Sequence, residues 1–331
     1  MDTTEERSQI VKIYDFYRKK VYPNLYELCR CVDASRYRRF AFALSDDYLF
    51  SERFHPTRTM KITEGEFFYE YFNFCYMHNI LTLMLYAVYH HAYPRVCINE
   101  SNQDMIQWEW YFRQIPLPKD RMLPEMICSR RFASFQPGFR DIYEPEYIRM
   151  WSRLYKAFIH LNARTCAYVE NEYRTVFKGK KRVLGVICRG TDYLRLRPAG
   201  HPVQPPTEDV ISLCREKIGK DSYDAIYLAT EEKQIRDQFC RAFPGMILEN
   251  KRQYYDDIYY KENIQYIKDV HFDRENNNYL MGLEYLSSII LLSRCTSLIG
   301  GNCGGTMAAL FFNDSRYEYT HIFDLGLYPY I

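Results

Sequence analysis

The sequence predicts a globular α/β protein with two domains, a helix-rich α/β domain in residues 1–178 and a doubly wound parallel sheet in residues 179–331. The length of 331 residues is about twice that of an average domain. Hydrophobic residues make up 47% of the chain and charged residues 26%, which is typical of a globular protein. After residue 182, short apolar runs alternate with amphipathic segments, which is the pattern of parallel strands connected by helices.

The first half is expected to be mostly helical. Apolar side chains recur at helical spacing in residues 5–32, and residues 65–93 are predicted to form a long buried helix that is ended by Pro94. Residues 95–98 are expected to form a short strand. The spacing of apolar residues over 144–177 predicts one long amphipathic helix before the basic segment at the domain boundary.

The second half is expected to alternate strands with helices. The first apolar run is hydrophobic on both faces, as in a parallel strand covered by helices on each side. Thr207 is expected to cap a helix whose first turn holds Glu208 and Asp209. The predicted strands are 183–188, 225–229, 246–248, 297–299 and 321–323, and the other predicted helices are 231–243, 278–295 and 304–312.

Charge and cysteine content exclude several classes of protein. The 44 basic and 42 acidic residues leave a formal charge of +2, so no nucleic-acid partner is expected. The N-terminal residues lack the pattern of a signal peptide, and the most apolar stretch, residues 80–89, is too short for a transmembrane segment. The 11 cysteines include no CxxC pair, so reduced thiols in a cytoplasmic protein are favoured over a metal site or disulfides.

Ligands of an open parallel sheet bind beyond the carboxyl ends of its strands. Three segments follow predicted strands, namely residues 189–192, 230–232 and 300–306. In the third, four glycines surround Asn302 and Cys303, which would let the backbone approach a ligand ahead of a helix N-terminus that attracts anions. The alternative interpretation is a tight turn in which the glycines serve packing.

Arg189 is a second candidate for ligand binding. A guanidinium at a strand end can hold a diphosphate through two parallel hydrogen bonds, and Asp192 is placed to fix its orientation. The alternative is a purely structural Arg–Asp pair. Together with the glycine-rich segment, Arg189 indicates a nucleoside diphosphate. A further alternative is a cysteine hydrolase with Cys303 as nucleophile at a helix N-terminus.

Three segments in the second half resemble the donor motifs of the GDP-fucose-using fucosyltransferases, the superfamily of α1,6-fucosyltransferases and protein O-fucosyltransferases. They are residues 185–192, which are followed by His201 and Pro202, residues 226–232, and residues 282–306. The resemblance covers residues 181–325, and its specificity comes from three motifs in the same order and spacing.

The resemblance implies a GT-B-like glycosyltransferase whose C-terminal Rossmann-like domain binds the nucleotide-sugar donor. It implies an inverting reaction without a metal, and no cofactor beyond the donor, GDP-fucose. Arg189 matches the arginine that binds the β-phosphate, and with Asp192 it is the expected catalytic pair. The implied donor-binding residues are Arg189, Gly190, Thr191, His201, Thr230, Glu231, Glu284, Ser288, Asn302, Cys303, Gly304, Gly305 and Thr306.

The sequence departs from the family pattern at two donor positions. Ile187 stands where a histidine is common, and Ser288 stands where an acid reads the guanine edge. Glu284, one helical turn earlier, is a substitute for that acid. These departures leave another nucleoside diphosphate sugar open as the donor. The general base that an inverting transfer needs is not identified, and the candidates are Asp192, Glu231, Glu100, Asp104 and Glu109.

The predicted function is transfer of a sugar, fucose in the first instance, to a glycan or lipid-linked glycan during surface polysaccharide biosynthesis. The expected location is the cytoplasm, with peripheral contact at the inner face of the membrane compatible with it. Trp108, Trp110 and Tyr111 are expected to stack on acceptor sugars, and the alternative is that they fill the core. The competing class is a non-catalytic nucleotide- or glycan-binding protein on the same fold.

Overall fold

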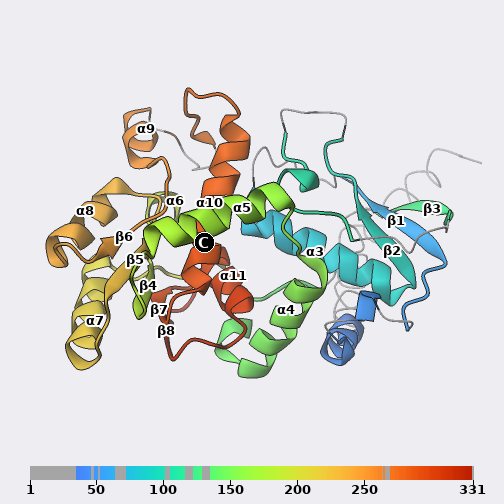
Figure 1. Ribbon diagram of the computed structural model, residues 1–331, viewed down its shortest axis with the longest axis horizontal. Helices are drawn as coiled ribbons and strands as arrows, with labels where there is room; N and C mark the ends of the chain where they lie inside the picture. The colour runs from blue at the N-terminus through green and yellow to red at the C-terminus, as the bar shows by residue number, and fades with distance from the viewer. Residues whose placement is uncertain are drawn as a thin grey trace, which may run out of the picture.

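The predicted α/β class is confirmed: the structure contains two parallel sheets, one in each half of the chain (Figure 1). It is a computed structural model. It describes residues 35–45, 48–50, 53–63, 72–100, 105–115, 122–128, 135–262, 264 and 269–329, without the side chains of Phe50, Thr191, Asp192, Asp256 and Asp257. No helix within these ranges is long and apolar enough to cross a membrane.

The sheet of the first half has three parallel strands in the order β2-β1-β3. Its elements are β1 (Arg58–Ile62), α3 (Phe74–Tyr89), β2 (Ala92–Val96) and β3 (Glu125–Cys128), with single 3-10 turns η2 (Tyr48–Phe50), η3 (Trp108–Trp110) and η5 (Asp141–Tyr143). The helix predicted to end at Pro94 ends at Tyr89 instead, and Pro94 lies inside β2 opposite Met60. A proline is tolerated there because β2 is an edge strand.

The prediction of a single long helix over 144–177 is wrong. The structure has two helices, α4 (Pro145–Phe158) and α5 (Ala163–Val176). The Asn162 side chain accepts a hydrogen bond from the Thr165 backbone N–H at 2.8 Å and so caps a new helix. The apolar spacing continues across this break, and for that reason periodicity alone did not reveal it.

The sheet of the second half has five parallel strands in the order β6-β5-β4-β7-β8. In chain order this is third, second, first, fourth, fifth, the doubly wound arrangement with its switch point between β4 and β7. Thr207 is the first helical residue of α7 rather than its cap, which is Pro206. The elements are β4 (Val183–Ile187), α6 (Thr191–Leu196), α7 (Thr207–Lys220), β5 (Ala225–Ala229), α8 (Lys233–Ala242), β6 (Ile247–Leu248), α9 (Asp256–Lys261), α10 (Asn277–Ser293), β7 (Ser297–Gly301), α11 (Gly304–Asn313) and β8 (Tyr319–Phe323).

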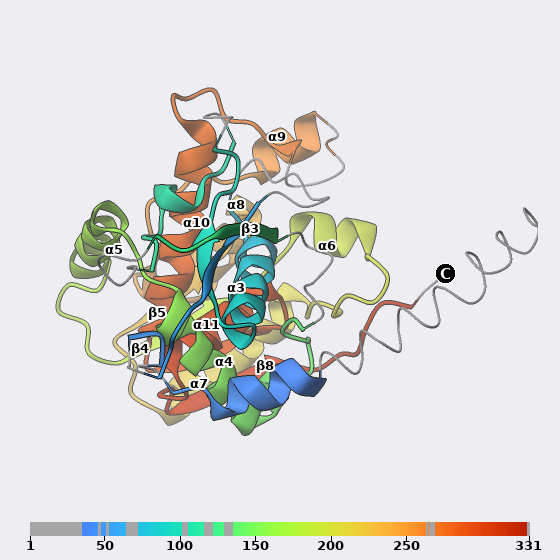
Figure 2. The same ribbon diagram turned by 90° about the vertical axis from the view of Figure 1, so that its right-hand side faces the viewer.

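Alternate side chains of the central strands pack against helices on opposite faces of the sheet. Leu184 and Val186 belong to a core with α7 and α8, whereas Val183 and Ile187 belong to a second core that includes α10 and α11. This second core continues into α3 and α4 of the first half, which lie between the two sheets (Figures 1 and 2). The boundary between residues 178 and 179 therefore stays a prediction.

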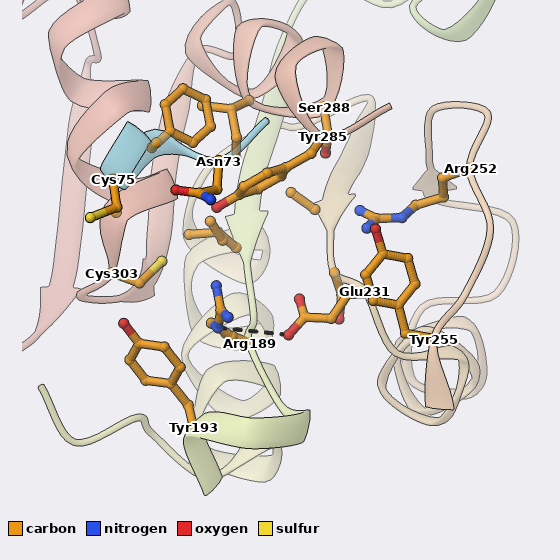
Figure 3. A pocket seen from close by; sticks show the side chains of 16 residues that line it. Asn73, Cys75, Arg189, Tyr193, Glu231, Arg252, Tyr255, Tyr285, Ser288 and Cys303 are labelled. Carbon is orange, nitrogen blue, oxygen red and sulfur yellow. Dashed lines mark ion pairs between the residues drawn. The ribbon is translucent and has the colours of Figure 1, made fainter. Parts of the chain in front are cut away.

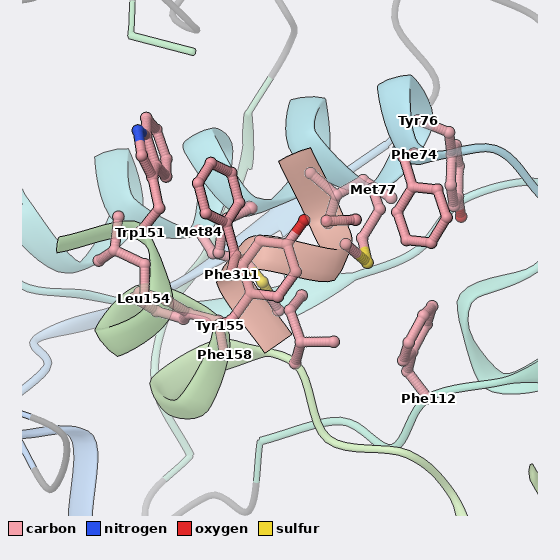
Figure 4. Packing of buried hydrophobic residues seen from close by; sticks show 14 of the residues in the cluster. Phe74, Tyr76, Met77, Met84, Phe112, Trp151, Leu154, Tyr155, Phe158 and Phe311 are labelled. Carbon is pink, nitrogen blue, oxygen red and sulfur yellow. The ribbon is translucent and has the colours of Figure 1, made fainter. Parts of the chain in front are cut away.

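The contact between the halves is dominated by aromatic rings around α11. Phe311 packs edge-on against Tyr155 at a centroid distance of 5.4 Å and is stacked on Trp151 at 6.0 Å (Figure 4). All three side chains are buried. Burying several large aromatic side chains is strongly favourable, so this packing fixes α11, and the loop before it, against the first half of the chain.

Candidate functional site

A cavity of about 280 Å³ lies at the switch point of the five-stranded sheet. It is bounded by residues that follow β4, β5 and β7, by one face of α10 and by the start of α3, so both halves of the chain contribute (Figure 3). Its volume is near the lower limit of typical small-molecule sites, about 300 Å³. The lining residues are Asn73, Phe74, Cys75, Ile187, Arg189, Tyr193, Ala229, Thr230, Glu231, Arg252, Tyr255, Tyr285, Ser288, Ile289, Cys303 and Gly304.

Arg189 enters the cavity directly after β4, as the sequence predicted. Its Nε atom lies 3.9 Å from Glu231 Oε1, and its guanidinium lies over the Tyr193 ring at 4.3 Å from the centroid. Glu231 also accepts the Gly190 backbone N–H at 3.3 Å. The guanidinium is therefore oriented by groups of the protein while it faces the cavity, as a preorganised anion site requires.

Gly190 and Thr230 both contact Glu232 next to this end of the cavity. A Cβ atom on Gly190 would lie 2.4 Å from the Glu232 carboxyl carbon, so a larger residue here would displace the Glu232 carboxylate. The Thr230 hydroxyl accepts the Glu232 backbone N–H at 3.3 Å, and Thr230 lines the cavity. The side chains of Thr191 and Asp192 lie outside the described residues, so the predicted Arg189–Asp192 pairing stays a prediction.

Most glycines of the predicted phosphate loop face the protein. A Cβ atom on Gly300 would lie 2.3 Å from Ile187 Cγ2 and 2.5 Å from the Ile187 carbonyl oxygen. A Cβ atom on Gly301 would lie 2.3 Å from Gln204 Oε1. A Cβ atom on Gly305 would lie 3.0 Å from the hydroxyl oxygen of Tyr285 on α10. The packing interpretation therefore accounts for these three glycines.

Gly304 differs, because it lines the cavity at the first turn of α11. A Cβ atom there would meet Phe74 at an ordinary distance of 3.7 Å. Cys303, the N-cap residue, is buried and lines the cavity, with its Sγ 3.4 Å from Thr306 Oγ1. The Thr306 hydroxyl donates to the Gly301 carbonyl at 2.5 Å, so it closes the loop on itself. Cys303 and Gly304 are thus the loop residues that reach the cavity.

Two predicted donor-binding residues lie beside the cavity rather than in it. The Asn302 amide donates to the Phe139 carbonyl at 2.8 Å, and Asn302 lines a different pocket next to β8. His201 Nδ1 lies 3.1 Å from the Tyr193 hydroxyl. His201 therefore contacts a cavity residue without lining the cavity itself.

The two residues predicted to meet the nucleotide base are separated by the structure. Ser288 lines the cavity, and its carbonyl accepts the Tyr227 hydroxyl at 3.2 Å. Glu284 does not line it. The buried Glu284 carboxylate forms two bonds with Arg274, at 2.6 and 3.1 Å, and accepts the Gln253 backbone N–H at 3.3 Å.

Of the aromatic residues predicted to stack on acceptor sugars, two are buried in the core and one lines a pocket. Trp108 and Tyr111 are both 0% exposed, so the structure places them in the core, as the alternative held. A fully buried ring offers no face to a sugar. Trp110 is partly exposed and lines a polar pocket of about 700 Å³ together with Asn162 and Arg164.

Among the candidate general bases, Glu231 is the described carboxylate that lines the cavity. Glu109 lines the polar pocket beside Trp110, and Glu100 is exposed next to Cys97. Asp104 lies outside the described residues, as does the Asp192 side chain.

Several polar cavity residues were not predicted from the sequence, among them Asn73, Arg252, Tyr255 and Tyr285. Arg252 and Tyr255 follow the short strand β6, so the strand-end rule would have found them had it been applied there. Burial raises the pKa of Tyr255 to about 12 and that of Tyr285 further, so both hydroxyls are neutral hydrogen-bond groups. Asn73 caps α3 by accepting a backbone N–H at 2.9 Å, and no donor motif points to it.

No protein-family model matches the chain, and no curated protein sequence matches it significantly. The structure is similar to fucosyltransferase NodZ from Bradyrhizobium, with a TM-score of 0.43, 15% identity and coverage of 76% of this chain and 92% of that chain. It is similar to POFUT1 in complex with GDP, with a TM-score of 0.48, 11% identity and coverage of 81% and 98%. It is also similar to a variant of FUT1 from Arabidopsis thaliana in complex with GDP, with a TM-score of 0.46, 10% identity and coverage of 86% and 73%. At this level of identity the similarity concerns the fold.

Proposed function

We propose that the protein is an inverting, metal-independent glycosyltransferase that transfers fucose from GDP-fucose to a glycan hydroxyl during surface polysaccharide biosynthesis. The observation that carries the proposal is the meeting of Arg189 and the N-terminus of α11, at Gly304, in one cavity at the switch point of the sheet. A cationic side chain and a helix N-terminus that follow two adjacent strands suit a diphosphate leaving group.

The proposed reaction needs positive charge at the diphosphate and a base at the acceptor. The acceptor hydroxyl oxygen attacks the anomeric carbon, the bond from that carbon to the β-phosphate oxygen breaks, and its electron pair stays on the diphosphate. Arg189 would stabilise this charge in place. The hydroxyl proton would pass to a carboxylate, for which Glu231 is the candidate that lines the cavity.

The choice of GDP-fucose rests on the motif resemblance in residues 185–192, 226–232 and 282–306. The cavity geometry supports a diphosphate and does not by itself name the sugar. Another nucleoside diphosphate sugar is the first alternative, and a non-catalytic nucleotide- or glycan-binding protein is the second. A hydrolase that uses Cys303 is the third.

Substitution of Arg189 tests the proposal. Arg189→Ala is expected to lower kcat/KM for GDP-fucose hydrolysis or transfer about 150-fold, or about 3 kcal/mol, on the scale of losing one preorganised donor. The matched control is Arg241→Ala, an exposed arginine on α8, which should retain normal turnover. Near-normal turnover in Arg189→Ala would overturn the mechanism.

Two further measurements separate the alternatives. A binding protein would bind GDP and release none from GDP-fucose, whereas a transferase transfers some fucose to water and so releases GDP. Cys303→Ala should retain activity, and its loss, with GDP affinity intact, would favour the cysteine hydrolase.

A further inference from the structure

We infer that Arg252 selects the base of the donor by donating hydrogen bonds to acceptor atoms, which in guanine are O6 and N7. This inference rests on the proposed function, because it concerns the same cavity. It replaces recognition by a carboxylate, which the motif resemblance implies at the position of Ser288 and for which Glu284 was the expected substitute.

Arg252 lies in the segment between β6 and α9 and lines the cavity with Tyr255 and Ser288. Figure 3 shows its guanidinium directed into the cavity from the side opposite Cys303. The Arg252 Nε atom is buried and has no hydrogen-bond partner within the described part of the chain. A buried N–H without a partner costs about 1–3 kcal/mol, so a ligand with acceptor atoms at this place gains affinity.

The carboxylates near the cavity already have other roles. The N1–H and amino group of guanine are donors, and reading them requires acceptors such as a carboxylate. Glu284 is held by Arg274 through two hydrogen bonds and does not line the cavity. Glu231 accepts the Gly190 N–H and lies 3.9 Å from Arg189 Nε, where it is the candidate general base. The charged side chains among the described lining residues are Arg189, Glu231 and Arg252, and with Arg189 assigned to the diphosphate and Glu231 to the acceptor, Arg252 is left for the base.

The position of Arg252 suits the base rather than the diphosphate. Neighbouring strands lie about 5 Å apart, so β6 and β4, which are separated by β5, lie about 10 Å apart. Arg189 follows β4 and Gly304 follows β7, on the far side of β4 from β6. A ribose would span the gap between a diphosphate at Arg189 and a base at Arg252.

The chemistry of arginine then predicts which bases fit. A guanidinium pairs with guanine O6 and N7 through two parallel hydrogen bonds, worth about 1–3 kcal/mol of discrimination. Adenine presents an amino group in place of O6, so it places a donor against a donor. Uracil offers a single carbonyl at this edge and fills less of the space.

The test is calorimetric binding of nucleoside diphosphates to the full chain. Inosine diphosphate keeps O6 and N7 but lacks the guanine amino group, and 7-deazaguanosine diphosphate keeps the amino group but lacks N7. We expect GDP and inosine diphosphate to bind within about threefold of each other. We expect 7-deazaguanosine diphosphate and ADP to bind at least about tenfold more weakly, within the range of one bidentate pair.

Variants assign the effect to Arg252. Arg252→Ala should weaken GDP binding about tenfold or more and abolish the preference for GDP over 7-deazaguanosine diphosphate. Arg252→Lys keeps the charge, loses the paired geometry and should also lose the preference. Arg241→Ala should match the wild type. A circular dichroism melt of each variant verifies the fold.

The outcomes separate the two proposals. If inosine diphosphate binds tenfold more weakly than GDP, or if the 7-deaza analogue binds as well as GDP, the inference about Arg252 is wrong. An equal loss for every nucleotide in Arg252→Ala would assign Arg252 to the phosphates and would also overturn it. If no diphosphate binds, or if Arg189→Ala leaves GDP affinity unchanged, the proposed function itself fails.

Discussion

The loop at the end of β7 has one side that faces the cavity and one side that faces the protein. Gly304 faces the cavity, where a Cβ atom would have its nearest neighbour at 3.7 Å. Gly300 and Gly301 face the protein, where the nearest neighbour would lie at 2.3 Å for each. A single glycine-rich motif therefore has two physical causes, and ligand approach is the cause for only part of it.

Two arginine–glutamate pairs show the same difference between residues that face the cavity and residues that face the protein. Arg274 and Glu284 form a bidentate pair at 2.6 and 3.1 Å outside the cavity, and they leave little capacity for another partner. Arg189 and Glu231 approach only to 3.9 Å and both line the cavity. The closed pair serves the fold, whereas the loose pair is placed to respond to a ligand.

The largest expected effect comes from adding one methyl group to the protein-facing side of the loop. Gly300→Ala should lower the free energy of unfolding by about 3 kcal/mol, because the methyl group meets the Ile187 backbone as well as its side chain. Gly304→Ala makes the same change on the cavity side and should leave that free energy within about 1 kcal/mol, since alanine favours the helix. Urea denaturation measures both, and equal losses would remove the distinction between the two sides.

Much of the fold was accessible from the sequence because the second half obeys a simple pattern. Its strands are buried on both faces, and continuous apolar runs placed β4, β5 and β7 within one or two residues of their observed ends. The break between α4 and α5 was not accessible, because it depends on one capping bond from Asn162 within an unbroken helical periodicity.

The site was accessible only in part, for a different reason. The rule that ligands bind at strand ends found Arg189 and Glu231, which the chain places there directly. Asn73 reaches the same cavity through packing of α3 against α11, and such packing leaves no local signal. The engagement of Glu284 by Arg274, ten residues away, likewise depends on the conformation of the intervening turn.

Breaking the closed ion pair is expected to have the second largest effect. Glu284→Gln leaves the Arg274 charge, which is 18% exposed, without its counter-charge and should lower the free energy of unfolding by about 2 kcal/mol. The affinity for GDP should change less than about threefold, because Glu284 does not line the cavity. Glu231→Gln is the matched change at the loose pair and should affect turnover more than stability. A tenfold loss of GDP affinity in Glu284→Gln would restore Glu284 as a base-reading residue.

A third effect, of about the same size as the second, tests the side of α11 that packs in the buried core. His78 hydrogen-bonds to the Tyr155 hydroxyl and packs against the Phe311 ring at a centroid distance of 6.1 Å. Burial lowers the pKa of His78 to about 3, from 6.5 for an exposed histidine, so the unfolded chain takes up a proton that the folded protein does not. Above pH 6.5 His78 is neutral in both the folded and the unfolded state, so its burial costs no proton. As the pH falls from 6.5 toward 3, only the unfolded state takes up the proton, and the free energy of unfolding decreases. Between pH 7 and pH 5 the loss is about 2 kcal/mol.

The pH dependence of urea denaturation isolates this contribution when the wild type is compared with His78→Phe. The phenylalanine ring keeps the bulk of the side chain and cannot titrate, so the decrease in unfolding free energy between pH 7 and pH 5 should be about 2 kcal/mol smaller in the variant. The difference between the two decreases removes the contribution of every other titrating group. Identical decreases would mean that His78 is reached by protons in the folded state, and the packed side of α11 would then be as open to water as the side that faces the cavity.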